Sequence, residues 1–574
     1  GTHTPPHPQP QHNTATTLPL ITAHTMGSYA STPEEERALE AKLNRDDAIS
    51  EMNKIQGFDV VIVCCTSGSQ TGYWQQRLEE SKGFIAPKTA RVFAVEEDWA
   101  DGGAGNGLGT LYAWQKAVKM DSSIEKDLKA GTISVGLYHT AGKGTRLAPM
   151  PGSECNNKPA VKLPAVIKTD KATFPLTILE AVIKQTGVYA SSRKGRLSVF
   201  WGDQVFIPSV KAQYTPTHHA DILARLGPMP DKEEYNSQGL FNYGLICVEK
   251  SGDAKQIEKV SYETAVGIGT FEKVGTSVGS FSVSHTLLGA LMTEFKSELA
   301  AKKGKMDTDP HFWMPLTLDK KTYADFMLTK GEFDTKEASD THYARIERIK
   351  AVCDGVEPKG RYFGSVDVGQ DAYWWDYGQV AYYMENNLKL LKGSTSAEKD
   401  EANAMKAFLG LEKGDAKGPL KAANCVVSDC KVAQASTSSN SVLSSVYATS
   451  LEVQESILVN VTAANIKCKN CLLYNVADTK DIELGEGEIL VGMTVDGKAF
   501  QMRSKFNVCG KKNWKKWTQS GTMSEADLKL VSGNPYTFEQ IYKLNKKADV
   551  EKISEAVSKQ FQSCKESVLK GAKL

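Results

Sequence analysis

Residues 139–164, "HTAGKGTRLAPMPGSECNNKPAVKLP", directly follow the apolar run "ISVGLY", which predicts a buried strand. Gly142 and Gly144 allow the chain to turn sharply after this strand and bring bare backbone close to a ligand. Successive N–H groups in such a turn can hold a phosphate, and Arg146 adds a forked cation that matches phosphate oxygens. Lys158, whose backbone is restricted by the following proline, brings a second charge. The stretch therefore predicts a phosphate-binding turn, although the Walker motif GxxxxGK[ST] is absent.

Apolar strands alternate with helical stretches on both sides of this turn, from residue 57 to about residue 208. "FDVVIVCC", "ARVFAVEE" and "LSVFWGD" are predicted strands, and "TGYWQQRLEESK", "LGTLYAWQKAVKM" and "PLTILEAVIKQTGVY" are predicted helices. Continuous apolar strands separated by helices are typical of a mostly parallel sheet covered on both faces. Such sheets bind ligands at the carboxyl ends of their strands. Because "TAGKGTR", "WGDQ" and "GAGNGLGT" follow strand ends, we expect the site there.

The rest of the chain changes character twice. Residues 240–290 are β-rich with turn residues between the strands, and a polar stretch at about 394–420 is typical of a linker. Residues 424–500 carry short apolar pairs every five to seven residues, which favours a β-solenoid with three strands per turn over an antiparallel sandwich. The predicted units are a disordered segment 1–32, an α/β domain 33–395, a linker 396–422, a β-helix domain 423–510 and a helical tail 511–574.

Composition and charge exclude several classes of partner. The 574 residues include 69 Lys and Arg against 68 Asp and Glu, so a nucleic-acid partner is not expected. No apolar run approaches the roughly 20 residues that span a bilayer, so no membrane partner is expected either. Eleven cysteines, several inside apolar runs, fit buried reduced thiols in a cytoplasmic protein. The Cys468/Cys471 pair is more typical of a packed β-core than of a zinc site.

Five pieces of the sequence, in order from His139 to Asn386, resemble the sugar-1-phosphate nucleotidylyltransferases, the pyrophosphorylases that make nucleotide sugars. "AGKGTR…P…KP" resembles the family signature, and "FWGDQVF" resembles its strand ending in Gly-Asp. "NYGLICVEKSGDAKQIEKV" and "FEKVGTSVGSF" resemble segments of its sugar pocket. "WWDYGQVAYYMEN" resembles its DxG segment and the helix after it. The solenoid-like part resembles the left-handed β-helix that follows the catalytic domain in several members.

The order of the strands differs from the usual family order. Family chains open with GxGTR, whereas here about 80 residues of strand, helix and strand come first and contain "GNGLGTLYAW". In uridylyl-transferring members "LGTxxA" comes after GxGTR and touches the base. The resemblance therefore implies a circularly permuted Rossmann-like domain, in which permutation can preserve the site because packing sets the sheet neighbours. The N-terminal block also resembles fucose-1-phosphate guanylyltransferases, which place a similar segment ahead of the phosphate loop.

The resemblance implies attack of a sugar-1-phosphate on the α-phosphate of a nucleoside triphosphate, with release of pyrophosphate. The implied catalytic residues are Arg146, Lys158 and Asp203, and Asp203 and Asp376 are the expected ligands of the cofactor Mg²⁺. The expected nucleotide-binding residues are Gly107, Gly109, Thr110, Ala141, Gly142, Gly144, Thr145 and Gly202. The expected sugar-phosphate-binding residues are Tyr243, Gly244, Glu272, Lys273 and Gly279. One departure is Val274, where the family has a proline after Glu-Lys.

Several functions remain open at this point. We favour UTP with glucose-1-phosphate, because "GLGT" resembles the uridine-binding loop; the alternative is GTP with fucose-1-phosphate or mannose-1-phosphate. A regulatory nucleotide-sugar-binding subunit without activity is a different class, but it would be expected to lack the two aspartates. An acyltransferase working through the solenoid needs a histidine there, and residues 424–500 contain none. The expected partners are the nucleoside triphosphate and the sugar-1-phosphate; self-association through the β-helix or the tail is left open.

Overall fold

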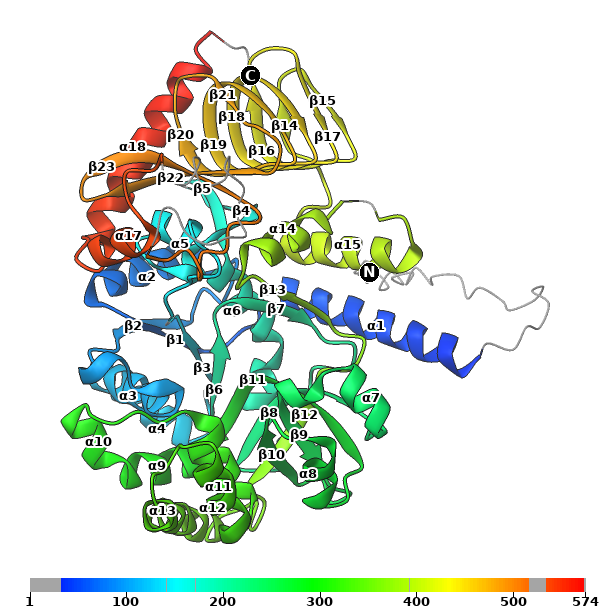
Figure 1. Ribbon diagram of the computed structural model, residues 1–574, viewed down its shortest axis with the longest axis vertical. Coiled ribbons are helices and arrows are strands. Elements are labelled where there is room, and N and C mark those ends of the chain that lie inside the picture. Colours follow the sequence, from blue (N-terminus) through cyan, green and yellow to red (C-terminus); the bar gives the residue numbers. More distant parts are fainter. Residues whose placement is uncertain (1–31, 141, 171, 392, 516–532, 572–574) are drawn as a thin grey trace, which may run out of the picture.

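The computed structural model describes residues 32–140, 142–170, 172–391, 393–515 and 533–571. The predicted disordered segment 1–32 lies outside these ranges except for Thr32, which caps the first helix, α1 (Pro33–Asn53). Figure 1 shows an α/β part in the lower and middle regions and a coiled β part at the top, with helix α18 (Val550–Val568) along one side of the coil. The chain therefore has the mixed α/β class that the sequence predicts.

Four parallel strands form the centre of the α/β part. They are β1 (Val60–Cys65), β2 (Arg91–Glu96), β3 (Val135–His139) and β6 (Arg196–Trp201). Their order across the sheet is β2-β1-β3-β6, so the strand before the glycine turn is central. Counted from β3 as the first strand, with β1, β2 and β6 next, this order is three-two-one-four, the arrangement of doubly wound nucleotide-binding sheets. All four carboxyl ends meet at one edge.

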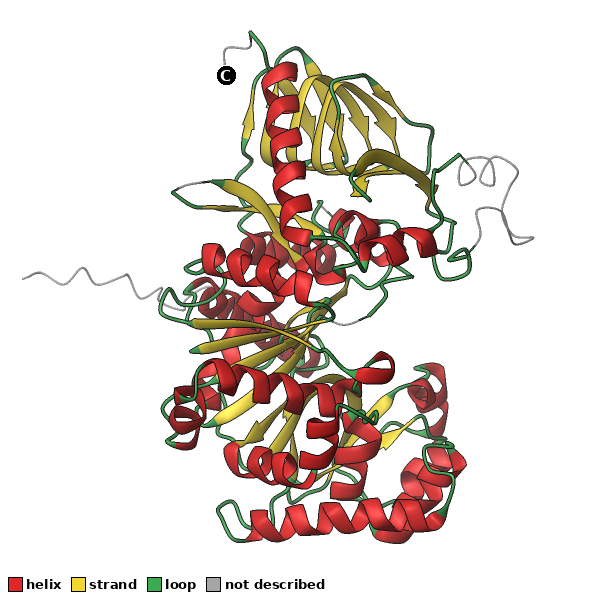
Figure 2. Ribbon diagram, turned by 90° about the vertical axis from the view of Figure 1, so that its left-hand side faces the viewer, coloured by secondary structure: helices red, strands yellow, loops and turns green. Residues whose placement is uncertain are grey.

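Both faces of these strands are buried. Successive residues of a strand point to opposite sides, and the side chains on each side pack in an apolar cluster. Val61 and Val63 of β1 pack in one apolar cluster together with residues of α1, α2 (Gly68–Ser81) and α6 (Ile178–Thr186). Val60 and Ile62 pack in a second cluster on the other face, with α3 (Gly105–Met120) and α4 (Ser123–Lys129). Figure 2 shows the helix layers on both sides of the strands. Apolar runs without alternation therefore correctly predict these strands.

A mixed extension continues the sheet beyond β6. Strand β11 (Lys273–Ser284) pairs antiparallel with β6, β8 (Ala220–Gly227) and β9 (Gly244–Val248). Strand β10 (Ala254–Glu258) continues the sheet beyond β9, and β12 (Phe363–Asp367) runs parallel to β8. Two separate antiparallel pairs lie outside it, β4 (Lys162–Lys168) with β5 (Thr173–Thr177) and β7 (Gln204–Ile207) with β13 (Tyr373–Asp376).

The other helices of the α/β part are short or lie at its lower end in Figure 1. They are α5 (Met150–Ser153), α7 (Lys232–Ser237), α8 (Tyr262–Gly267), α9 (His285–Glu294), α10 (Lys296–Ala301), α11 (Met314–Thr317), α12 (Lys320–Thr329), α13 (Lys336–Asp354) and α14 (Val380–Leu388). Within the described ranges, no helix has both the length and the apolar character needed to cross a bilayer.

The segment predicted as a linker, 396–422, is largely structured. Ser396–Leu409 forms helix α15, whose first turn is closed by a capping box between Thr395 and Glu398. Phe408 is fully buried, and Lys184 Nζ donates a hydrogen bond to its carbonyl oxygen at 2.6 Å. The linker prediction was wrong because apolar residues at helical spacing are masked by the many charged residues between them.

The coiled β part is built mainly from parallel strands of successive turns, which excludes the antiparallel sandwich; its last two strands, Glu488–Val495 and Lys498–Lys505, pair antiparallel. Its strands are β14 (Ala416–Lys417), β15 (Leu420–Ala423), β16 (Val426–Val432), β17 (Ser436–Ser439), β18 (Val442–Gln454), β19 (Ile457–Lys469), β20 (Leu472–Ala477), β21 (Ile482–Glu483), β22 (Glu488–Val495) and β23 (Lys498–Lys505). Val442 pairs with Ile457, and Ile457 pairs with Leu472, so equivalent positions recur every 15 residues here. Cys468 and Cys471 lie in the apolar interior of this coil.

Polar ladders accompany the apolar interior of the coil. Asn460 and Asn475 both have a positive φ, and Asn460 Nδ2 donates a hydrogen bond to Asn475 Oδ1 at 2.8 Å. Ser456 Oγ accepts from the Cys471 amide at 3.0 Å, one turn later. Asparagine tolerates the left-handed backbone that each tight corner requires. The regular apolar pairs and the small polar residues of this region therefore have separate structural roles.

The coil and the tail are in direct contact with the α/β part. Tyr474 donates from its hydroxyl to Glu154 and accepts the Lys162 amide N–H at 2.9 Å. The tail contains α17 (Phe538–Asn545) and α18, and Asn545 Nδ2 donates to the Gly152 carbonyl oxygen at 2.8 Å. Gly510 lies directly against the carbonyl oxygen of Thr145. The C-terminal third therefore braces the glycine turn that follows β3.

Candidate active site

The glycine turn after β3 has the backbone that its sequence predicts. Gly142 and Gly144 adopt φ values of 125° and 62°, in the region that favours glycine. Ala141 lies outside the described residues. Thr145 is half-buried and Arg146 is exposed, and the Arg146 carbonyl oxygen accepts the amide N–H of Val380 at 3.1 Å. This contact ties the turn to the start of α14.

Lys158, Asp203 and Asp376 come together beside this turn, although they are far apart in the sequence. Lys158 Nζ donates to Asp203 Oδ2 in an ion pair. Pairing between β7 and β13 places Asp376 opposite Gln204, next to Asp203. A Cβ atom on Gly378 would lie 2.9 Å from Asp376 Oδ1, 3.5 Å from Lys158 Nζ and 3.6 Å from Asp203 Oδ2. All three charged groups therefore surround one glycine at the carboxyl edge of the sheet.

This group can hold a hard cation. Its two carboxylates are partly accessible, with the Asp203 side chain 29% exposed, and they offer oxygen donors of the kind that Mg²⁺ prefers. Asp376 Oδ1 also accepts the Gly378 amide at 2.6 Å, which fixes its orientation. Two carboxylates and one ammonium leave an excess of one negative charge. The donor set thus fits a divalent cation together with phosphate oxygens.

We expect Gly378→Ala to lower the turnover number of the expected nucleotidyl transfer by at least about tenfold. A small displacement of aligned catalytic groups is enough to slow a reaction by that factor. The added methyl group would occupy the space between the two carboxylates and the Lys158 ammonium. Gly378 has no positive φ, so the backbone tolerates alanine and the thermal midpoint should change little. Gly289→Ala is the matched control, since a Cβ there meets nothing within 4 Å. Equal activity of the two variants would remove Gly378 from the site.

The "GNGLGT" segment lies at the same edge but is not a surface loop. Helix α3 begins at Gly105, and the amides of Gly107 and Leu108 donate to the Met306 carbonyl oxygen at 2.9 and 3.3 Å. A Cβ on Gly107 would lie 3.1 Å from Phe312, so close packing accounts for this glycine. The 306–312 segment covers the start of this helix.

Gly109 and Thr110 are the members of this motif that approach the sheet edge. A Cβ on Gly109 would lie 2.7 Å from Glu97 Oε2, and Thr110 Oγ1 lies 2.8 Å from His139 Nε2. Gly202 also serves close packing, because its Cβ position is 3.0 Å from the His139 carbonyl oxygen. The "GLGT" and "GKGTR" motifs therefore share one edge of the sheet, although 35 residues separate Gly109 from Gly144 in the sequence.

The predicted sugar-binding residues fall into two groups. Gly279, with a φ of 76°, lies directly against Trp201 at the end of β6. Gly244 opens β9 and follows the exposed Tyr243. Glu272 and Lys273 lie at the other end of the pair formed by β9 and β11, and Lys273 Nζ is 3.9 Å from Asp367.

The ladder between β9 and β11 sets the distance between these groups. Leu245 pairs with Thr276, and Val248 pairs with Lys273. Lys273 and Gly279 are six residues apart on β11, which corresponds to about 20 Å along an extended strand. The structure thus does not gather Glu272 and Lys273 with Gly279, and their sugar-binding role stays a prediction.

A further cluster at the same edge has no counterpart among the residues predicted from the sequence. Cys64, Glu97 and His139 come from the ends of β1, β2 and β3 and place a sulfur, an oxygen and a nitrogen atom close together. The sequence separates them by tens of residues, and only the alignment of three parallel strand ends could have indicated them.

A scan against models of known protein families gives no match for this chain, and a search of curated proteins gives none either. Any function must therefore be argued from the motifs and from the geometry of the strand-end site.

Proposed function

We propose that this protein is a sugar-1-phosphate nucleotidylyltransferase that makes a nucleotide sugar and pyrophosphate, with UTP and glucose-1-phosphate as substrates. The observation that carries the proposal is the convergence of Lys158, Asp203 and Asp376 around Gly378, beside a glycine turn that leaves the central strand. The family resemblance of the motifs supports the same reaction. We also propose that the coil winds left-handed, as in family members, and that the protein works in the cytoplasm, in line with its free cysteines.

Alignment and charge neutralisation suffice for this reaction, and no protein nucleophile is needed. A phosphate oxygen of the sugar-1-phosphate attacks the α-phosphorus of the triphosphate, a P–O–P bond forms, and pyrophosphate leaves as the bond to the β-phosphate breaks. The amides of the glycine turn and the cations of Arg146 and Lys158 bind the triphosphate. Asp203 and Asp376 would hold Mg²⁺, which neutralises phosphate charge when bound. When the triphosphate binds, the Lys158 ammonium would leave Asp203 and pair with a phosphate oxygen instead.

The proposal is tested by a pyrophosphate-release assay across four nucleoside triphosphates and a panel of sugar-1-phosphates. Release with UTP and glucose-1-phosphate supports it in full. Release with GTP and fucose-1-phosphate or mannose-1-phosphate keeps the reaction but corrects the substrates. Binding of a nucleotide sugar without release under any combination would instead indicate a regulatory subunit.

We expect Arg146→Ala and Lys158→Ala to weaken triphosphate handling more than sugar-phosphate binding. A charge-assisted contact is worth roughly 1.5–3 kcal/mol, so the KM for the triphosphate should rise by about 10- to 100-fold. Lys143→Ala is the control in the same turn, because Lys143 Nζ lies 6.0 Å from the ring centre of Tyr542, on the tail. Unchanged kinetics for both Arg146→Ala and Lys158→Ala would mean that the turn does not bind phosphate.

A further inference from the structure

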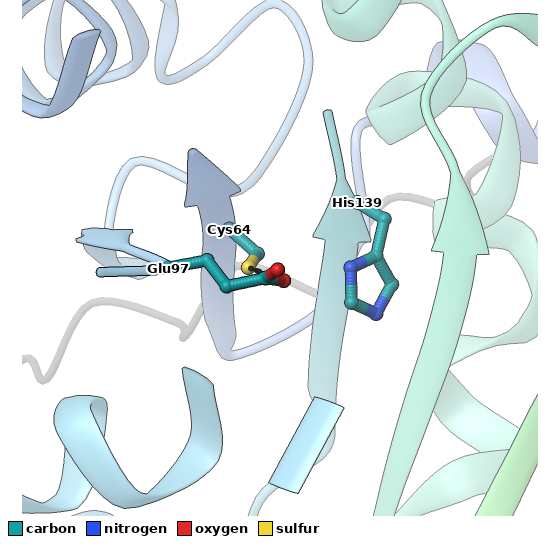
Figure 3. Close-up of side chains that lie close together, drawn as sticks. All are labelled: Cys64, Glu97 and His139. Carbon is teal, nitrogen blue, oxygen red and sulfur yellow. Dashed lines mark hydrogen bonds between the residues drawn. The ribbon is translucent and has the colours of Figure 1, made fainter. Parts of the chain in front are cut away.

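The cluster of Cys64, Glu97 and His139 lies at the carboxyl ends of three neighbouring strands. One ligand atom from each residue lies within 4.8 Å of the other two, and Cys64 Sγ is 3.8 Å from Glu97 Oε2. Figure 3 shows the carboxylate of Glu97 reaching between the sulfur and the imidazole ring. Tetrahedral Zn²⁺ with ordinary bond lengths needs ligand atoms roughly 3.3–3.8 Å apart. The three ligand atoms would therefore need to move only slightly closer together to bind the ion.

The hydrogen bonds of Thr110 fix the tautomer of His139. The Thr110 hydroxyl donates to the Asn106 carbonyl oxygen at 2.7 Å, and a carbonyl can only accept. The same hydroxyl, 2.8 Å from His139 Nε2, must therefore accept from that nitrogen. In the neutral ring, Nε2 therefore carries the proton. The lone pair is then on Nδ1, which faces the Glu97 carboxylate in Figure 3.

The lone pair of His139 Nδ1 and the carboxylate of Glu97 therefore face each other, and both groups are electron-rich. His139 is only 7% exposed, and within the described ranges no donor hydrogen-bonds to its Nδ1. Glu97 Oε1 accepts the Ala104 amide at 2.9 Å, and Glu97 Oε2, which accepts from the Cys64 thiol at 3.8 Å, lies toward the ring. A lone pair and a carboxylate oxygen repel each other unless a cation or a proton lies between them.

We propose that Cys64, Glu97 and His139 bind a divalent cation of borderline softness, of which Zn²⁺ is the type case. Thiolate and imidazole ligands suit Zn²⁺ and do not suit Mg²⁺, so this site is distinct from the one proposed at Asp203 and Asp376. One thiolate, one carboxylate and one neutral imidazole balance the charge of the ion, which a buried site requires. On binding, the Cys64 proton is released to solvent. The fourth tetrahedral position is left for water or another ligand.

The same contacts explain what the ion would do for the fold. Glu97 holds the Ala104 amide just before α3, and His139 donates to Thr110 in the second turn of that helix. Metal-bound histidines characteristically donate their other ring nitrogen to an oxygen, and this fixes the ring. The ion would therefore tie the start of α3 to the ends of β1 and β3. This role goes beyond nucleotidyl transfer and does not depend on it.

The test uses the purified full chain, stripped with a chelator and titrated with Zn²⁺ against a chromophoric chelator, without nucleotide. We expect one Zn²⁺ per chain, and Co²⁺ in its place should give a thiolate-to-metal charge-transfer band. Cys64→Ser should lower Zn²⁺ affinity by at least about 100-fold, more than the loss of an outer partner. The matched control is Cys65→Ser, because Cys65 is equally buried but points to the opposite face of β1.

Three results would overturn the site. They are a wild-type chain that binds no Zn²⁺, a Co²⁺ form without the thiolate band, and an unchanged Zn²⁺ affinity in Cys64→Ser, which would place the ion on other cysteines. The Co²⁺ spectrum is measured on the wild type, so it decides the question even if Cys64→Ser fails to fold. None of these readouts requires catalysis, so their failure would leave the nucleotidyl-transfer proposal intact.

Discussion

Asp203→Asn is expected to reduce turnover by about 100-fold while triphosphate affinity changes much less. Removing one preorganised charge from such a site typically costs this much in rate. Asparagine keeps the shape of the side chain and removes the negative charge that pairs with Lys158. The Lys158 cation then has one fewer anion nearby and stays available to the triphosphate. Turnover should fall most at limiting Mg²⁺, because one of the two proposed carboxylate ligands is lost.

The measurement is steady-state pyrophosphate release at several Mg²⁺ concentrations, with triphosphate binding measured separately. Asp325→Asn is the control, since Asp325 pairs with Lys321 on the exposed helix α12. Near-normal turnover of Asp203→Asn at limiting Mg²⁺ would exclude Asp203 from the metal site. An equal loss in Asp325→Asn would show that the effect reports general stability.

The strands and the glycine turn could be predicted because their signals are local. Strands β1 and β3 are unbroken apolar runs, and Gly142 and Gly144 follow the second run directly. Asp203 and Asp376 could be selected because "FWGDQVF" and "WWDYGQVAYYMEN" resemble segments of the nucleotidylyltransferase family. Their common position around Gly378 depends on the β7–β13 pair, which no local pattern indicates.

The features that were missed depend on contacts between distant segments. Gly107 appears in the sequence as a ligand-facing glycine, but the Met306 carbonyl and the Phe312 ring, some 200 residues away, account for its small size. The cluster of Cys64, Glu97 and His139 could not be predicted either, since a single acidic residue after a strand can have many roles. Burial and register, rather than residue type, decide these cases.

Glu180→Gln is expected to destabilise the protein by about 3–5 kcal/mol at neutral pH, the usual cost of removing one member of a buried ion pair. The Glu180 side chain is fully buried and accepts from Arg77 Nε at 2.7 Å and Nη2 at 2.8 Å. It also accepts the Thr177 amide at 2.9 Å and the Ser81 hydroxyl. Glutamine would leave the Arg77 guanidinium in the interface between α2 and α6 without a counter-charge. Urea unfolding at pH 7 measures the difference.

The same ion pair predicts a pH dependence. Burial raises the pKa of Glu180, but the charge and hydrogen bonds of Arg77, together with those of Ser81 and Thr177, lower it overall below its ordinary value. A carboxyl whose pKa is lower in the folded state stabilises the protein above its unfolded pKa of about 4.3, and this contribution is lost as pH falls through the folded value. The gap between the wild type and Glu180→Gln should therefore narrow as the solution is acidified below about pH 4.

A double variant separates the ion pair from simple packing. Arg77→Met with Glu180→Leu replaces both charges by apolar groups, and such replacements are often neutral or stabilising. We expect the double variant to regain most of the stability that Glu180→Gln loses, because no charge is then left buried without a partner. The exposed pair of Lys389 and Glu385, 3.4 Å apart, serves as the control: Glu385→Gln should cost less than about 1 kcal/mol. If the double variant were as unstable as Glu180→Gln, the loss would come from the side-chain shapes and the hydrogen bonds to Thr177 and Ser81, and the buried charge would not be its cause.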